Sequence, residues 1–305
     1  MGALSYNIAL AAANILFGIS FSVYVSLLRG ALLPEQLFSL QLLFSTIVCL
    51  PFAISRPNFL RLSLNDFGSI FIVALLVIFG WWYMLIEGAS YTNPIDASTL
   101  STIGPIFTLL TAIIVEGRRA NKGESTGVIV ALLGVAIILV RQGRELVVDN
   151  GEGYGNALVL CAVVAIAINT VLITPVLRRH GTMVVMGWYY IIGTLLAMPM
   201  LWRTLPTIAE ISFSTLDYIE IGYILTLGST LPIYMLYVGS EHLTPLHAAL
   251  YRYLQPILAT SLAIWRGQSE IDRTNIVGAV LIFLGMLVVV FATPRNKTPE
   301  IITRG

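Results

Sequence analysis

The chain has 305 residues, of which 57% are hydrophobic and only 11% are charged, and its formal net charge at pH 7 is +1. A soluble domain carries about 25% charged residues because its surface faces water, so most of this surface is expected to face lipid. The small net charge argues against nucleic-acid binding, which requires a basic patch. The three histidines and two cysteines show no metal-ligand spacing. We therefore expect neither a metal nor a cofactor.

Ten stretches of the sequence are long and apolar enough to cross a membrane as helices, since about 20 apolar residues span the hydrocarbon core. In chain order they cover residues 6–28, 35–54, 67–88, 94–115, 125–141, 154–177, 182–202, 216–239, 245–265 and 274–292. The first stretch is too long for a cleaved signal peptide and lacks its basic region. The short connections leave no room for a soluble catalytic domain. The sequence predicts an all-α integral membrane protein with ten transmembrane helices.

Basic residues are unevenly divided between the two sets of predicted loops. One set, which shares its side of the membrane with both chain ends, holds ten basic residues, and the opposite set holds six. The richer set is Arg56, Arg61, Arg118, Arg119, Lys122, Arg178, Arg179, Arg295, Lys297 and Arg304. Loops rich in lysine and arginine stay in the cytoplasm. We expect a multi-pass protein of the cell inner membrane with both termini in the cytoplasm.

The sequence repeats itself at an offset of 151 residues. The matched positions include Tyr83 with Tyr234, Gly88 with Gly239, Pro94 with Pro245, Pro105 with Pro256, Gly127 with Gly278, and Gly134 with Gly285. Two apolar sequences share leucine and alanine by coincidence, but coincidence rarely pairs prolines and glycines at one offset. The pattern therefore indicates a duplicated unit.

Each copy of the unit contains five predicted spans. An odd number of crossings turns the second copy upside down relative to the first. Inverted repeats of this kind are typical of transporters, which bind substrate near the midplane where the halves meet. We expect residues 1–142 to form the first five-helix repeat, 143–153 a connecting loop, 154–293 the second repeat, and 294–305 a cytoplasmic tail.

A recurring motif opens the fourth and ninth stretches. It reads Asn-Pro-Ile-Asp-Ala at residues 93–97 and Thr-Pro-Leu-His-Ala at 244–248, followed by Gly-Pro-Ile at 104–106 and Gln-Pro-Ile at 255–257. With the paired glycines of the closing helices, this pattern resembles the EamA family of the drug/metabolite transporter superfamily over nearly the whole chain. The resemblance implies two inverted EamA-type repeats around a central cavity, and the export of small organic solutes.

Arg252 is the one clear charge inside a predicted span, where a charge usually faces a cavity or a partner. At 100° per residue, His247, Tyr251 and Gln255 share its helix face. Two interpretations are open. Either Arg252 binds an anionic group of the substrate while Tyr251 and Gln255 orient the rest, or it pairs with a carbonyl or an acid and holds helices together. His247 is a candidate for proton coupling or a solvated histidine.

Other polar side chains in the predicted spans are expected to line the substrate cavity beside Arg252. They are Asn14, Tyr83, Ser101, Asn169, Tyr234 and Tyr237. Asp96 either caps its helix together with Asn93 or is a second candidate for proton coupling.

These patterns favour a secondary transporter that exports a small organic metabolite, such as an amino acid or an organic anion, by alternating access. Its expected partners are that substrate and the lipid bilayer. The sequence has no P-loop for ATP hydrolysis. A sugar-phosphate or nucleotide-sugar carrier is an alternative that would want more than one intramembrane cation. A membrane-embedded lipid-modifying enzyme is another, but it needs a nucleophile and base that the sequence does not show, so we expect no enzyme.

Overall fold

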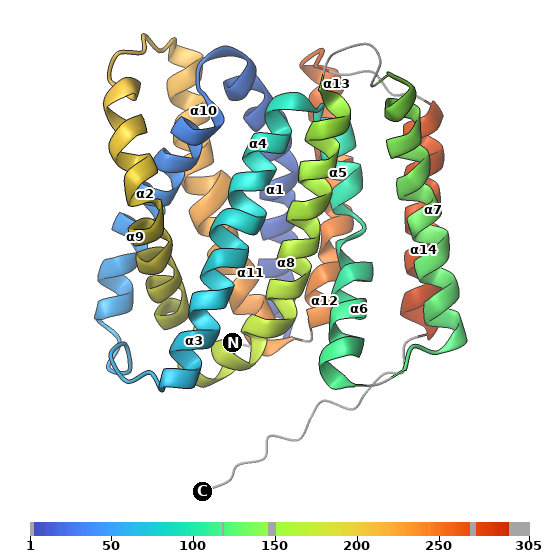
Figure 1. The fold of residues 1–305 in the computed structure, drawn as a ribbon, viewed down its shortest axis with the longest axis horizontal. Coiled ribbons are helices and arrows are strands. Elements are labelled where there is room, and N and C mark those ends of the chain that lie inside the picture. The colour runs from blue at the N-terminus through green and yellow to red at the C-terminus, as the bar shows by residue number, and fades with distance from the viewer. Residues whose placement is uncertain (1–2, 118, 146–150, 244, 269–272, 293–305) are drawn as a thin grey trace, which may run out of the picture.

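The computed structural model describes residues 3–117, 119–145, 151–243, 245–268 and 273–292. Its described residues form helices and no strand (Figure 1). The first half contains α1 (Ala3–Gly30), α2 (Pro34–Ile54), α3 (Leu64–Ala74), the π-helical η1 (Leu75–Tyr83), α4 (Met84–Tyr91), α5 (Pro94–Ser101), α6 (Gly104–Glu116) and α7 (Lys122–Glu145). The second contains α8 (Glu152–His180), α9 (Thr182–Ile208), α10 (Thr215–Leu225), the π-helical η2 (Thr226–Thr230), α11 (Leu231–His242), α12 (Pro245–Leu250), the 3-10 helix η3 (Tyr251–Tyr253), α13 (Leu254–Trp265) and α14 (Arg273–Ala292).

Several of these elements continue one another as long rods. Seven helical runs in the described residues are long and apolar enough to cross a membrane, and each has 21 to 29 residues. They are α1, α2, α3 to α4, α5 to α6, α8, α9, and α10 to α11. The helix α7, the run from α12 to α13, and α14 stand beside them (Figure 1). The predicted all-α membrane fold is confirmed, and each predicted stretch corresponds to one rod.

The caps of two helices show the repeat in atomic detail. At the start of α3, Ser63 Oγ accepts a hydrogen bond from the backbone N–H of Asp66 (3.1 Å) and donates one to its Oδ2 (2.8 Å). At the start of α10, Ser214 and Asp217 make the same two bonds at 3.2 and 2.7 Å. Serine accepts well at this position because it satisfies an N–H group that the helix leaves unpaired. The two pairs lie 151 residues apart, so the halves begin these helices with the same serine–aspartate cap.

Irregular segments also fall at equivalent positions in the two halves. The π-helical segments η1 and η2 begin 151 residues apart. The α5–α6 rod breaks at Thr102, and the α12–α13 rod breaks at η3, again at equivalent positions. Pro105 and Pro256 follow these breaks, and proline cannot donate the backbone hydrogen bond that a continuous helix needs. Both breaks lie inside the membrane-spanning region.

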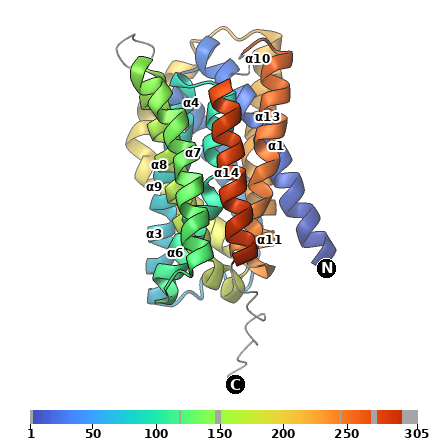
Figure 2. The same ribbon diagram turned by 90° about the vertical axis from the view of Figure 1, so that its right-hand side faces the viewer.

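Two glycine contacts join α7 to α14, which lie side by side at one edge of the bundle (Figure 2). A Cβ on Gly127 would lie 2.5 Å from the carbonyl oxygen of Gly285, and one on Gly134 would lie 2.7 Å from that of Gly278. Small residues let transmembrane helices approach this closely. Exchanging the halves turns the 127–285 contact into the 278–134 contact. The two copies are therefore related by a pseudo-two-fold axis.

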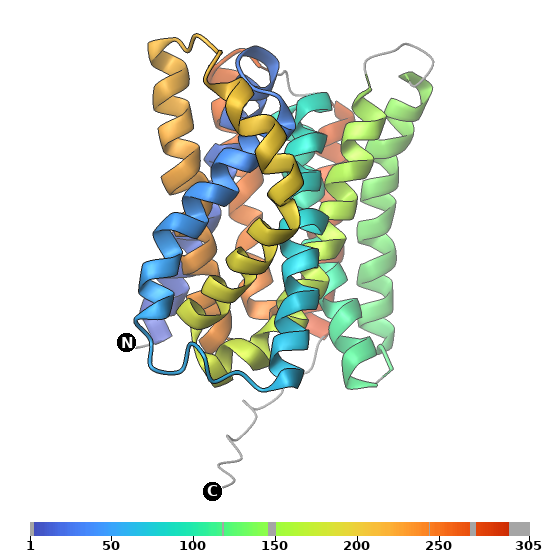
Figure 3. The same ribbon diagram turned by 60° about the vertical axis from the view of Figure 1, so that its left-hand side comes forward.

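Hydroxyl groups join α2 to α9, the equivalent helices of the two halves, which cross on one side of the bundle (Figure 3). Ser39 Oγ lies 2.8 Å from Thr204 Oγ1, and Thr46 Oγ1 lies 2.7 Å from Thr194 Oγ1. Such interhelical bonds help to hold helices together in lipid. The bundle is thus held at one edge by glycine packing and at the other by hydroxyl pairs.

Helix α1 begins and α14 ends at the same end of the bundle, which is the lower end in Figure 1. There the Tyr6 ring stacks on His242 at 3.9 Å, and Asn121 Nδ2 donates to the carbonyl of Ala292 (2.8 Å). We call this the terminal end, and we call the other the opposite end. Helix α2 begins and α9 ends at the opposite end.

Candidate substrate site

A cavity lies inside the bundle between α1, η1, α4, α5, η2, α11 and the break at η3. The empty space between its lining atoms is about 550 Å³, but the centre of a water molecule can occupy only about 20 Å³ of it. That is room for one or two waters, so the cavity is narrow in this state. Its polar lining consists of Asn14, Tyr24, Ser101, Ser229, Arg252 and Gln255. Its aromatic and apolar lining includes Phe17, Phe21, Trp81, Trp82, Leu85, Ile233 and Leu236.

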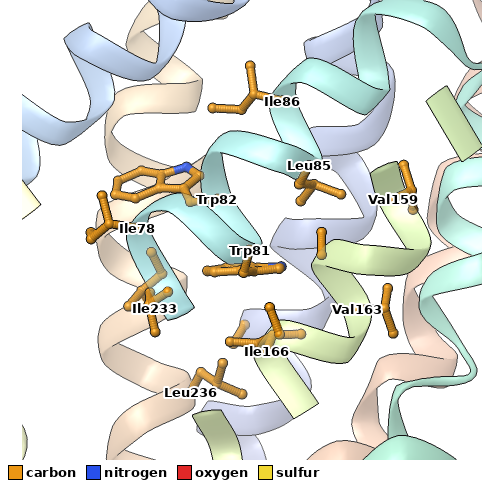
Figure 4. Packing of buried hydrophobic residues seen from close by; sticks show 14 of the residues in the cluster. Ile78, Trp81, Trp82, Leu85, Ile86, Val159, Val163, Ile166, Ile233 and Leu236 are labelled. Atoms are coloured by element: carbon orange, nitrogen blue, oxygen red, sulfur yellow. The ribbon is translucent and has the colours of Figure 1, made fainter. Parts of the chain in front are cut away.

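Equivalent positions of the two halves contribute to this lining in pairs. Ser101 and Arg252 are 151 residues apart, as are Leu85 with Leu236 and Trp82 with Ile233. Figure 4 shows Trp81, Trp82 and Leu85 on the η1–α4 run, and Ile233 and Leu236 on α11. Ser101 ends α5 and Arg252 lies in η3, so both occupy the helix breaks. The cavity therefore lies on the pseudo-symmetry axis.

Arg252 brings the cavity its one cation among the described residues. Its side chain is buried, with 6% of its surface exposed. In the described part of the chain, no hydrogen bond or ion pair holds its guanidinium. Burying an unpaired ion costs several kcal/mol unless a partner compensates it. The arrangement is suited to receiving an anion.

Gly104 gives Arg252 the room to lie there. A Cβ on Gly104 would lie 3.0 Å from Arg252 Cδ and 3.4 Å from its Nε. Gly104 begins α6 and is the repeat equivalent of Gln255. One half thus supplies the charged side chain, and the other supplies the space for it.

Two carboxamides and a hydroxyl complete the polar wall. Gln255 Nε2 donates to Asn14 Oδ1 (2.8 Å), and Asn14 Nδ2 donates to the carbonyl of Leu10 (2.8 Å). Ser101 Oγ donates to the carbonyl of Ala97 (2.8 Å). These bonds hold the three side chains in place beside Arg252. The structure thus brings together four residues singled out in the sequence.

A buried hydrogen-bonded chain fixes the aromatic wall. Gln41 Nε2 donates to the Tyr24 hydroxyl (2.9 Å), and Trp82 Nε1 donates to Gln41 Oε1 (3.1 Å). Gln41 is fully buried on α2, behind the cavity. Sequence reasoning missed this chain and the aromatic residues of α1. Their spacing was the available signal, because Asn14 and Tyr24 lie on one helical face with the two phenylalanines between them.

Other predicted residues form separate pairs. The Tyr251 hydroxyl donates to Asn7 Oδ1 (2.7 Å) near the terminal end. Asn169 Nδ2 donates to the Tyr237 hydroxyl (3.2 Å), and both residues are buried. None of these residues lines the cavity around Arg252. Tyr234 is half-buried against the apolar core.

Tyr83 lines a second hollow at the opposite end, where α2 begins and α9 ends. The centre of a water molecule can occupy about 540 Å³ of it. Glu35 and Arg203 are its charged lining residues. We call it the opposite-end hollow.

Of the two candidates for proton coupling, Asp96 is not part of the cavity lining. The backbone N–H of Asp96 donates to Asn93 Oδ1 (2.9 Å), and Asn93 Nδ2 donates to Asp96 Oδ2 (3.0 Å), so Asp96 takes part in the cap of α5. His247 belongs to α12, but its side chain falls outside the described residues. In the part of the chain that the structure describes, no group of three or more His, Cys, Asp or Glu residues could hold a metal ion.

Inverted helical halves that meet at a cavity with two broken helices are an architecture typical of membrane transporters. Residues 4–140 and 153–291 each match the EamA-like transporter family. The chain belongs to this family and is a transporter of the drug/metabolite transporter superfamily.

Relatives are named consistently with this assignment. An uncharacterized transporter of Clostridium kluyveri is 24% identical over 272 residues, which cover 85% of this chain and 84% of the relative. The uncharacterized transporter YyaM of Bacillus subtilis is 21% identical, with 76% of each chain covered. A WAT1-related protein of Arabidopsis thaliana is 24% identical, with 86% of this chain and 82% of the relative covered. One crystal structure shares the fold, with a TM-score of 0.66 at 16% identity over 97% of this chain and all of that one.

Proposed function

We propose that the protein is a secondary transporter that moves a small organic anion across the cytoplasmic membrane by alternating access. The observation that carries this proposal is the buried guanidinium of Arg252 at a helix break inside the bundle. A fixed cation within a transmembrane segment generally serves substrate or ion passage. Since Arg252 is the one cation in the described lining, the site suits a single negative charge better than a phosphate.

The two ends of the bundle are closed to different degrees, which supports alternating access. At the terminal end, Asp66 contacts Arg179 (2.6 Å) and His180 (2.9 Å). There Glu241 Oε2 also accepts two hydrogen bonds, from the backbone N–H and the hydroxyl of Thr182. At the opposite end Arg266 pairs with Glu220 (2.6 Å), and the opposite-end hollow lies where α2 begins and α9 ends. In the proposed mechanism the polar contacts close the terminal end, and the opposite-end hollow marks the side from which the cavity would open.

The basic loops support an orientation of the molecule in the membrane. Arg56, Arg61 and Lys122 lie at the terminal end in the described residues. The positive-inside rule then places this end in the cytoplasm, with the hollow on the outer face.

Transport is tested in proteoliposomes by counterflow, in which an unlabelled solute inside drives the entry of the same labelled solute. We expect saturable counterflow of at least one member of a library of organic acids, and none in empty liposomes. Conversion of a library member into a new product by the purified protein, without counterflow, would identify an enzyme and contradict the proposal.

Orientation is tested separately with single cysteines. Cys49 and Cys161 are first replaced by alanine, and a cysteine is then placed at exposed Lys122 or at exposed Ser212 between α9 and α10. A membrane-impermeant maleimide added to intact cells should label the cysteine at position 212 and leave the one at 122 unlabelled until the cells are opened. The reverse pattern would invert the proposed orientation.

A further inference from the structure

The central cavity has an unequal balance of charges. Its described lining holds one guanidinium and no carboxylate. The nearby acids are engaged elsewhere, because Glu35 lines the opposite-end hollow and Asp96 belongs to the cap of α5. Buried charges are normally paired. A ligand that neutralises this cavity must therefore carry one net negative charge.

Several hydrogen-bond donors around this cavity are open to a ligand. The guanidinium of Arg252 has five N–H donors, none of which is used within the described residues. The Tyr24 hydroxyl accepts from Gln41, so its own hydrogen is left for a ligand. Asn14 Oδ1 is already occupied by Gln255. A carboxylate finds donors here, whereas the described lining holds no carboxylate that could pair with the charge of an ammonium group.

The rest of the lining is flat and apolar. Phe17 and Trp81 stand edge to face with ring centroids 5.9 Å apart, and Phe21 and Trp82 line the same cavity. Aromatic rings stack or meet edge to face with one another. If these rings separate, the space between them fits a planar aromatic ligand better than a bulky, non-planar one.

We propose, resting on the function proposed above, that the substrate is an aromatic monocarboxylate and that the cavity excludes the corresponding zwitterion. The carboxylate pairs with Arg252 and Tyr24, and the ring enters between Phe17 and Trp81. The free α-amino acids are rejected because their ammonium group would be buried beside Arg252 with no carboxylate in the described lining to pair with it. The absence of a carboxylate from the described lining thus contributes to substrate specificity as much as Arg252 does.

Binding of three probes with one common body tests the proposal. All three carry a phenyl ring: phenylacetate adds a carboxylate, phenethylamine adds an amine, and phenylalanine adds both. Hexanoate, which has a carboxylate but no ring, tests the need for the ring. Affinity is measured on the purified full-length protein in nanodiscs by tryptophan fluorescence, since Trp81 and Trp82 line the cavity. Phenylacetate should bind at least about 30-fold tighter than phenylalanine, equivalent to about 2 kcal/mol, and measurably tighter than hexanoate and phenethylamine.

Substitutions at Arg252 locate the binding. Arg252→Gln should lower the affinity for phenylacetate at least about 30-fold, because truncating one partner of a buried charge pair is costly. Arg252→Lys, which keeps the charge, should retain part of the affinity. Arg56→Gln, at an exposed position outside the cavity, is the matched control and should leave affinity unchanged. Size-exclusion profiles and melting temperatures show whether each variant folds.

Each other outcome overturns the inference. Equal or tighter binding of phenylalanine would mean that the cavity compensates the charge of the buried ammonium group. Unchanged phenylacetate affinity in Arg252→Gln would place the anion elsewhere. If none of the four compounds binds while the counterflow screen finds another solute, the substrate class is wrong but the transporter function stands. If Arg252→Gln does not fold, loss of binding in folded Arg252→Lys counts against the charge pair.

Discussion

Positions related by the repeat carry different side chains in the cavity, and this difference gives the site its chemistry. Arg252 stands opposite Ser101 in the alignment of the halves, and Gln255 opposite Gly104. A duplicated unit with identical residues would place two cations on the axis, where they would repel each other. Here the second half supplies the charge, while the first half supplies Gly104, over which the arginine side chain lies.

Gly104→Ala tests this division directly. The added Cβ would lie 3.0 Å from Arg252 Cδ, so the arginine must shift by a few tenths of an ångström and lose its place beside Tyr24 and Gln255. We expect anion affinity to fall about 10-fold, which corresponds to about 1.4 kcal/mol, and the melting temperature to change little.

The control is Gly68→Ala in α3, where nothing lies within 4 Å of an added Cβ. Alanine is a better helix former than glycine by about 1 kcal/mol, so this variant should be as stable as the parent or more stable, and should bind normally. Equal binding by both variants would show that Arg252 does not depend on the space above Gly104.

The charge and the carboxamides are the part of the candidate site that the sequence predicts. Arg252, Gln255, Asn14 and Ser101 stand out in the sequence because polar groups are rare within apolar spans, and the structure places them around one cavity. The sequence pattern did not separate them from Asn169, whose partner comes from another helix 68 residues away. Pairing between distant helices depends on packing, which helical periodicity along one segment does not encode.

At the scale of elements, the breaks and π-helical segments fall at equivalent points of both halves. The prolines after the breaks are visible in the sequence, but the π-helices are not. A π-helix bonds residue i to i+5, so it changes the phase of every side chain beyond it. Trp81 and Trp82 lie in η1, and a 3.6-residue period therefore could not decide whether they face lipid or cavity. The structure turns both toward the cavity.

Gly285→Leu tests the packing of α7 against α14. The added Cβ would lie 2.5 Å from the backbone nitrogen of Ala131 and from the carbonyl oxygen of Gly127, and backbone atoms cannot rotate away. Overpacking of this kind costs about 1–3 kcal/mol, so the melting temperature should fall by about 2–12 °C. Anion affinity should stay unchanged because this contact lies at the edge of the bundle, away from the cavity.

Gly222→Leu on α10 is the comparison, because nothing lies within 4 Å of a Cβ there. It makes the same change in side-chain size on an exposed face, and its melting temperature should stay near that of the parent. A comparable fall in both variants would attribute the loss to leucine itself rather than to the helix pair.

At the scale of the whole molecule, the repeat makes the two ends comparable, and under the proposed mechanism their differences would bias which end opens. Arg29 donates to the carbonyl of Thr92 at the opposite end, as Arg178 does to that of Leu243 at the terminal end. Of the two equivalent cap residues Asp66 and Asp217, only Asp66 also forms ion pairs with basic side chains within the described residues. Asp66 also contacts the last turn of α8. The terminal end therefore carries ionic contacts that the opposite end lacks at the equivalent position.

Asp66→Asn should favour opening of the terminal end. Asparagine can keep the cap with Ser63 but loses the charge that attracts Arg179 and His180. Because the Arg179 side chain is 57% exposed, its pair is worth only about 0.2–1 kcal/mol, which shifts the opening equilibrium about 1.4- to 5-fold. A cysteine at Ser101, with Cys49 and Cys161 replaced by alanine, reports this opening through its rate of labelling by an impermeant thiosulfonate added at the terminal end.

Asp217→Asn is the matched control, because it makes the same chemical change in the same type of cap. In this variant the hydrogen bond from the backbone N–H of residue 217 to Ser214 is kept. No basic side chain of the described residues bonds to Asp217, so labelling from the terminal end should stay at the parental rate. Faster labelling in Asp66→Asn alone shows that ionic contacts at one end set the balance between the two access states. Equal rates in both variants would mean that the shared cap geometry, rather than the ionic contacts, governs the closure.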